Sequence, residues 1–173
     1  MSPFYLLFIF VIAQRMIELR IASSNERWMK DRGGVEIGEA HHKWFIIVHL
    51  LFFIAVFCEY QVKFMKFDVL PFYSIFFTAF IIAQLGRIWC IYSLGRFWNT
   101  KIIVLPKVAL IKKGPYKYIK HPNYLIVFIE LLVIPLMFGL YITALLFPFF
   151  HLLLLTIRVP LENDALQRYS TFE

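Results

Sequence analysis

The chain has 173 residues, of which 61% are hydrophobic and 19% aromatic, and its mean hydropathy is +0.71. A water-soluble domain of this length has too little interior to bury 20 phenylalanines and the long Leu/Ile runs, so a soluble fold is excluded. Two cysteines within apolar runs do not make a disulfide scaffold. The formal charge of +7 would suggest a nucleic-acid partner only in a soluble protein. We therefore expect an all-α integral membrane protein that binds no nucleic acid.

Five apolar stretches are long enough to form membrane helices. They cover residues 3–19, 44–60, 70–92, 123–138 and 140–157. The last two meet at Phe138-Gly139-Leu140, which is too tight for a lipid-exposed loop. The pattern predicts a helical hairpin there and leaves open whether it crosses the bilayer at full length.

Basic residues are concentrated on one side of these stretches. Fourteen Lys and Arg lie in the first loop, the loop after residue 92 and the tail, whereas the other side carries only Lys63 and Lys66. The positive-inside rule then predicts an external N-terminus, with both large loops and the tail in the cytosol. No linker divides the chain, so we expect a single domain, 1–173, with three spans in 1–92 and a motif segment, hairpin and C-terminal segment in 93–173.

The segment from 93 to 122 has an ordered sequence and seven basic residues without an acidic one. The basic residues are Arg96, Lys101, Lys107, Lys112, Lys113, Lys117 and Lys120. A basic loop that rests on anionic lipid is one interpretation. However, a β-branched run at 102–104, a Gly114-Pro115 turn and a His121-Pro122 helix start are unusual in a solvated loop.

Pro122 suits the first turn of a helix, where free N–H groups attract an anion. The Gly114-Pro115 turn would bring Tyr116 and Tyr118 back toward that helix start. Flat rings beside an anion site would suit an adenosine cofactor. A tyrosine-rich interfacial anchor explains the same residues, and the pattern alone leaves both interpretations open.

The run from Gly114 to Tyr124, GPYKYIKHPNY, followed one hairpin later by Arg158 and Glu162, resembles the isoprenylcysteine carboxyl methyltransferase family. The resemblance covers about residues 94–169, and the loop from Glu26 to His42 is similar to a bacterial branch of the family. It implies a methyltransferase of the bacterial cell membrane that uses S-adenosyl-L-methionine from the cytosol. The acceptor would be lipophilic and would enter from the bilayer.

The resemblance also assigns residues by position. Those implied to contact the cofactor are Val108, Ala109, Leu110, Ile111, Tyr116, His121, Pro122, Asn123, Tyr124 and Glu162. Arg158 matches a substrate-contacting position one turn before Glu162, so both can share a helix face, and this pair is expected to carry catalysis. Asn163 stands where the family often has a second acidic residue, so the sequence departs from the family pattern at one implied cofactor contact.

Ionisable residues within the apolar stretches need a separate explanation. Glu130 is costly in a membrane and is predicted to face the substrate, with a packing role paired to Arg87 as the alternative. Arg87 itself is expected to snorkel to the cytosolic surface. A general base for an enol or phenol acceptor would be Glu162, His121 or Glu130. No metal is expected, since His42 and His49 have no third ligand at metal spacing.

Three functions remain open at this point. The first is methylation of a prenylated cysteine carboxylate or of a small lipid such as an alkylpyrone, quinone or phenol. The second is a sterol- or isoprenoid-type reductase that uses a reduced nicotinamide cofactor, to which the C-terminal helices are also similar. The third is a non-catalytic lipid-binding membrane subunit. Arg158 with Glu162 favours the first.

Overall fold

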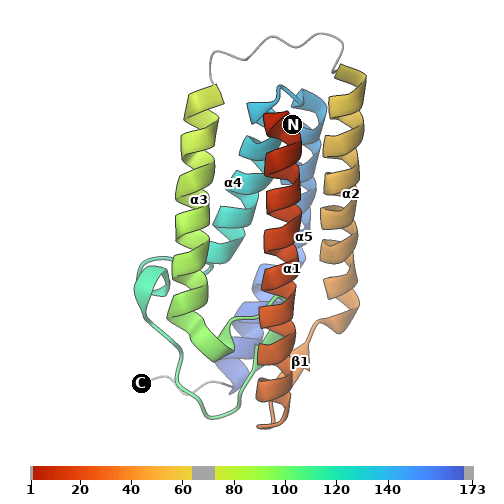
Figure 1. Cartoon of the computed structure of the whole chain (residues 1–173). Coiled ribbons are helices and arrows are strands. Elements are labelled where there is room, and N and C mark those ends of the chain that lie inside the picture. The colour runs from red at the N-terminus through yellow and green to blue at the C-terminus, as the bar shows by residue number, and fades with distance from the viewer. Residues whose placement is uncertain (1, 64–72, 170–173) are drawn as a thin grey trace.

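A computed structural model describes residues 2–63 and 73–169. Its α-helices are α1 (Pro3–Lys30), α2 (Glu39–Lys63), α3 (Tyr73–Leu94), α4 (Pro122–Met137) and α5 (Tyr141–Tyr169). The helices lie side by side along a common axis, with α1 in front of α4 and α5 and with α3 and α2 on either side (Figure 1). The predicted all-α class is confirmed, and residues 70–72 of the third predicted stretch lie outside the described residues.

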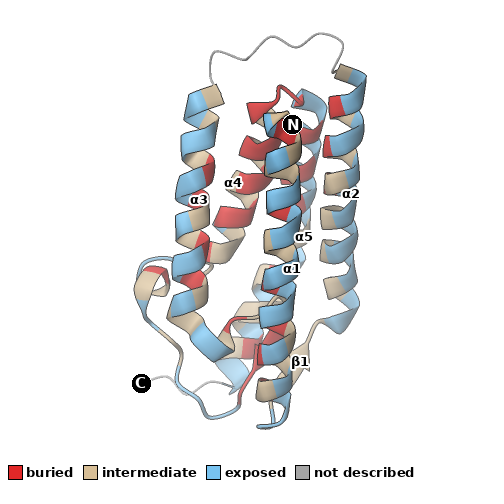
Figure 2. Ribbon diagram, viewed as in Figure 1, coloured by how far each residue is buried: buried red, intermediate tan, exposed pale blue. Residues whose placement is uncertain are grey.

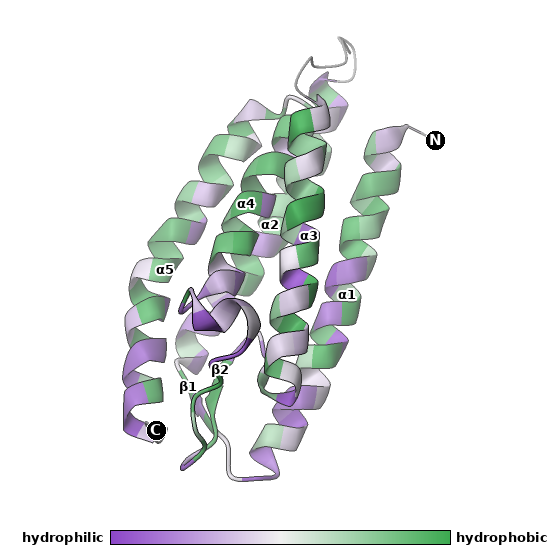
Figure 3. Ribbon diagram, turned by 90° about the vertical axis from the view of Figure 1, so that its left-hand side faces the viewer, coloured by the Kyte–Doolittle hydropathy of each residue, from purple (hydrophilic) through white to green (hydrophobic). Residues whose placement is uncertain are grey.

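Three of the described helices are long and apolar enough to cross a membrane. They are α2, α3 together with the turn that follows it, and α5, whereas α4 is a shorter apolar helix. Helix α1 carries Arg15, Glu18 and Arg20 near its middle, which interrupts its apolar stretch. Hydrophobic residues dominate the helices over most of their length, and hydrophilic ones gather at the end that carries β1 and β2 (Figure 3).

The predicted hairpin is present between α4 and α5. Gly139 has a φ of +67°, which a residue with a side chain rarely adopts, and the Leu140 N–H donates to the Pro135 carbonyl at 2.9 Å. The 16 residues of α4 span only about 24 Å, less than a hydrocarbon core of about 30 Å. Helix α5 has 29 residues and continues past its apolar part, so it carries Arg158 and Glu162 beyond the hairpin.

The core lies between the helices at the end of the bundle where α1 begins. Phe4 of α1 stacks on Tyr60 of α2 with ring centroids 3.5 Å apart, and its edge meets Phe138. Buried residues are densest on α4, which packs between α3 and α5 (Figure 2). Because lipid is as apolar as these side chains, close packing rather than the hydrophobic effect holds the helices together.

At the opposite end the chain forms a small antiparallel sheet of β1 (Val35–Ile37) and β2 (Ile102–Val104). Val35 pairs with Val104, and Ile102 and Val104 pack against Ala165 of α5. The β-branched run at 102–104 suits this half-buried pleat. The sheet therefore ties the segment after α3 to the end of α5.

Four charged side chains fasten this sheet to α1. Lys30 lies 2.6 Å from both Glu26 and Glu36, and Lys101 lies 2.8 Å from Glu26 and 3.1 Å from Glu36. Each cation thus bridges α1 and β1, and shared pairs hold their geometry better than isolated ones. The network fixes Thr100, the neighbour of Lys101, whose carbonyl belongs to the site described next.

Candidate active site

Arg158, Tyr124 and Glu162 form one hydrogen-bonded group where the start of α4 meets α5, at the end of α4 that is opposite to the hairpin. The Arg158 Nε–H donates to the Tyr124 hydroxyl at 2.8 Å, and that hydroxyl donates to Glu162 Oε2. The Arg158 Nη2–H donates to the Thr100 carbonyl at 2.5 Å. Arg158 is only 7% exposed. The expected pair of Arg158 and Glu162 on one face of a helix is therefore present, joined through a tyrosine of α4.

His121, just before α4, lies against the same group. Its Nδ1 is 3.6 Å from Glu162 Oε2, its Nε2 is 3.1 Å from Asn163 Oδ1, and its ring stacks on Tyr124 at 5.4 Å. Both nitrogens face acceptor oxygens, so the protonated ring is favoured. The Glu162 carboxylate holds the pKa of His121 above its usual 6.5. Asn163, which departs from the family pattern, still takes part in the site.

A pH dependence follows from this histidine. Because its pKa in the folded protein is raised, the stabilisation from charged His121 is complete below pH 6.5 and is lost as pH rises through the folded-state pKa. We expect His121→Gln to lower the melting temperature at pH 5.5 and to have a much smaller effect at pH 8.5. Equal losses at both pH values, in the purified protein, would contradict a charged His121.

The Gly114 turn packs Tyr116 against Ala83 and Cys90 of α3 and Ile126 of α4. Gly114 has a φ of +55°, and a Cβ there would lie 2.0 Å from Ser93 Oγ, so only glycine fits. Tyr116 hydrogen-bonds with Cys90, and burial raises the pKa of Tyr116, so its hydroxyl stays protonated. Tyr118 is 76% exposed and lies outside the site. The expectation that both rings turn toward the helix start is wrong for Tyr118, because the short turn η3 (Gly114–Lys117) ends before it.

The predicted cofactor segment at 108–111 lies elsewhere. Val108 and Ala109 are exposed, while Leu110 and Ile111 line a groove of about 620 Å³ at the end of α3. Other residues that line this groove are Trp28, Tyr92 and Phe97, and neither His121 nor Glu162 does. The structure thus gathers Tyr116, His121, Tyr124, Arg158 and Glu162, and places Leu110 and Ile111 at a different groove.

The start of α4 offers a donor and an acceptor. Pro122 has no N–H, and the Tyr124 N–H already donates to the His121 carbonyl at 3.2 Å, whereas the Asn123 N–H has no backbone partner among residues 2–63 and 73–169. The Asn123 Oδ1 is buried without a hydrogen-bond partner in the described part of the chain. An amino-acid cofactor presents a carboxylate and an ammonium group. Asn123 and the Glu162 carboxylate therefore fit the polar end of S-adenosyl-L-methionine.

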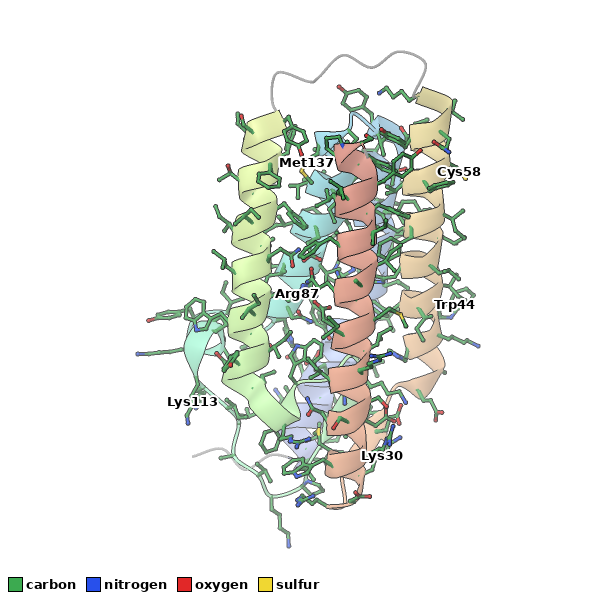
Figure 4. All side chains as sticks on the ribbon, in the orientation of Figure 1. Lys30, Trp44, Cys58, Arg87, Lys113 and Met137 are labelled. Carbon is green, nitrogen blue, oxygen red and sulfur yellow. The ribbon has the colours of Figure 1, made fainter. Side chains whose placement is uncertain are left out.

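Glu130 belongs to a second polar cluster, inside the apolar part of the bundle. Arg87 donates to Glu130 Oε1 at 2.9 Å and lies 3.2 Å from Glu18, while Arg15 lies 2.5 Å from Glu130 and 2.7 Å from Glu18. Figure 4 shows Arg87 in the middle of the bundle. Arg87 is 1% exposed, so the expectation that it snorkels is wrong. Two carboxylates neutralise two guanidinium groups there, and this removes the reason to reach water.

Glu130 pairs with Arg87, as the packing interpretation predicted, whereas a contact between Glu130 and the substrate stays a prediction. Gln84 also donates to Glu130, at 2.9 Å. Within residues 2–63 and 73–169, this cluster shares no hydrogen bond or ion pair with Arg158 or Glu162. The two carboxylates of the cluster, Glu18 and Glu130, are paired with its two guanidinium groups, Arg15 and Arg87.

Two residues outside the predicted set contact the site. The Arg158 guanidinium lies over the Phe45 ring at 4.9 Å, and that ring also meets His151 at 6.2 Å. His151 is 1% exposed, and its Nε2 donates to the Tyr124 carbonyl at 3.2 Å. In the neutral ring its Nδ1 then carries the lone pair, and this atom has no partner among the described residues. The seven-residue spacing from Arg158, two helical turns, is a signal that could have indicated His151.

Comparison with known proteins places the chain in a family. A model of the isoprenylcysteine carboxyl methyltransferase (ICMT) family matches residues 74–168. The uncharacterized protein YpbQ of Bacillus subtilis is 42% identical over 96% of this chain and 98% of its own length. An uncharacterized protein of Haemophilus influenzae is 28% identical over 90% of each chain. No solved structure matches. The chain therefore belongs to the isoprenylcysteine carboxyl methyltransferase family of membrane methyltransferases.

Proposed function

We propose that this protein is an S-adenosyl-L-methionine-dependent O-methyltransferase that methylates a lipophilic acceptor where the bilayer meets the cytosol. The observation that carries the proposal is the hydrogen-bonded group of Arg158, Tyr124 and Glu162, with His121 stacked on it. It combines a buried cation with a carboxylate at the end of the apolar bundle. A water-soluble cofactor and a membrane-borne acceptor can meet only at such a boundary.

On the cofactor side, the chain supplies groups of the right polarity. Glu162 and the Asn123 side-chain oxygen would accept N–H groups of the amino acid moiety, and the Asn123 N–H would donate to its carboxylate. The Tyr116 ring offers a flat surface for the adenosine part. When bound, the cofactor supplies an electrophilic methyl group on a sulfonium.

On the acceptor side, Arg158 would hold the nucleophilic oxygen. Its charge favours an anionic oxygen, and its contacts with Tyr124 and Thr100 fix the guanidinium plane, so it can orient an incoming group. The free lone pair of His151 Nδ1 would accept a hydrogen bond from a protic acceptor deeper in the bundle. We therefore favour a small lipid with an acidic hydroxyl, such as an alkylpyrone or a phenol, over a prenylated cysteine carboxylate.

The proposed orientation has the N-terminus outside and the active site facing the cytosol of a bacterial cell. The excess of lysine and arginine at the end that carries β1 and β2 supports it. Membrane lipid is the expected surrounding partner in either orientation.

Binding of S-adenosylhomocysteine to the detergent-purified protein tests the cofactor site by isothermal titration. We expect Glu162→Gln and Tyr116→Ala each to weaken binding by about tenfold or more, since each removes a polar or stacking contact worth about 1–3 kcal/mol. The matched control is Asp164→Asn, which neutralises an exposed carboxylate on the same helix and should leave binding unchanged.

If the proposed function is wrong, the same titration distinguishes the two alternative functions. If the folded protein does not bind S-adenosylhomocysteine but binds a reduced nicotinamide cofactor, the reductase alternative is correct. If it binds neither, the methyltransferase proposal is contradicted, and the lipid-binding subunit is favoured over the reductase.

A further inference from the structure

A groove of about 460 Å³ lies at the far end of α1 from the core, outside the candidate active site. The residues that line it are Arg20, Ser23, Ser24, Arg27, Trp28, Asp31 and Arg96. The residues from Arg20 to Trp28 lie on one face of α1, Asp31 is the C-cap of that helix, and Arg96 comes from the turn η2 (Gly95–Phe97). Three guanidinium groups and two hydroxyls thus converge from two elements, with one carboxylate, so the lining has a net positive charge.

The arginines of this groove differ from the other cations on α1. Arg15 is neutralised by Glu18 and Glu130, and Lys30 by Glu26 and Glu36. Among the described residues, no carboxylate pairs with Arg20 or Arg27, and the contact of Arg96 is a 3.3 Å hydrogen bond to the Ser24 hydroxyl. The groove therefore retains charge that an anion can neutralise.

The position of the groove along α1 indicates the source of that anion. Helix α1 lies alongside the three candidate membrane-spanning helices, and a hydrocarbon core corresponds to about 20 helical residues, so α1 reaches the headgroup level near Ala22, counted from Pro3. The groove begins at that level, where lipid phosphates lie. Deeper on the same helix face, Ile9, Ile12 and Met16 are exposed. One face of α1 is thus apolar for the length of an acyl chain and basic at the level of the headgroup.

We propose that this groove binds the phosphate of an anionic phospholipid, with its acyl chains along the apolar face of α1. Arginine forks match phosphate oxygens in bidentate pairs, and the serine hydroxyls add donors. A phosphate shared by Arg27 and Arg96 bridges α1 and η2. The turn η2 is followed along the chain by Thr100 and the motif residues. A bound lipid therefore stabilises the backbone that positions Thr100 without contacting the candidate active site.

Native mass spectrometry and thermal unfolding in detergent test this with added phosphatidylglycerol, phosphatidylcholine or inorganic phosphate. We expect phosphatidylglycerol to bind and to raise the melting temperature, with little effect of the other two. In the double variant Arg20→Gln/Arg27→Gln, the affinity for phosphatidylglycerol should fall by about tenfold. The matched control Lys43→Gln/Arg168→Gln removes the same charge from exposed sites outside the groove and should keep it.

Two outcomes would overturn the proposal. Equal losses in the two double variants would mean that overall surface charge, and not the groove, attracts the lipid. Stabilisation by inorganic phosphate equal to that by phosphatidylglycerol would mean that the groove selects a free anion and not a lipid. Neither readout depends on methyltransferase activity, so the result is independent of the proposed function.

Discussion

Replacing Arg158 by lysine is expected to lower kcat/KM for methyl transfer by about 10²–10³-fold, which corresponds to about 3–4 kcal/mol. The Arg158 side chain donates in two directions, from Nε to the Tyr124 hydroxyl and from Nη2 to the Thr100 carbonyl. A lysine has one nitrogen on a flexible stem and cannot keep both contacts while it orients an acceptor oxygen. Binding of S-adenosylhomocysteine should change by less than about threefold.

The measurement is transfer of a labelled methyl group to two acceptors, a synthetic alkylpyrone and an S-farnesylated N-acetylcysteine. We expect the alkylpyrone to be the better acceptor and Arg158→Lys to impair both. Arg168→Lys is the control, because Arg168 contacts only the exposed Asp164 and its replacement should keep the rate. A rate within threefold of the unmodified protein with both acceptors would show that Arg158 does not orient the acceptor.

Replacing Glu130 by leucine is expected to lower the free energy of unfolding by about 3–5 kcal/mol, because it leaves Arg15 and Arg87 inside the bundle with only Glu18 between them. The double variant Arg87→Met/Glu130→Leu should recover most of this loss, since it retains one balanced pair. Denaturant unfolding in detergent measures both. Glu39→Leu, which removes an exposed carboxylate, is the control and should have little effect.

The same variants test whether Glu130 contacts the substrate. A structural role requires that Glu130→Gln reduce stability and leave the KM for the acceptor unchanged in the folded fraction. If Glu130→Gln instead raises that KM at unchanged stability, Glu130 contacts the acceptor, and its pairing with Arg87 is secondary.

The sequence by itself determined the class of protein and the positions of its helices. Apolar length is a local property, so all five stretches became helices, and the hairpin at Gly139 followed from one tight connection. The Gly114 and Pro122 signals were also local, because each depends on the backbone freedom of a single residue. The four-residue spacing of Arg158 and Glu162, which places both on one face of a helix, is also local and could be predicted from the sequence.

Only the tertiary structure decided which charges are buried and which partners they have. Arg87 is buried because Glu18 and Glu130, from two other helices, neutralise it, and sequence spacing cannot show such a pairing. Likewise, Tyr124 joins Arg158 to Glu162 across more than 30 residues, and β1 pairs with β2 across more than 60 residues of sequence. The physical reason is that a charge in low-dielectric surroundings is stable only beside its counter-charge, and folding alone brings the two together.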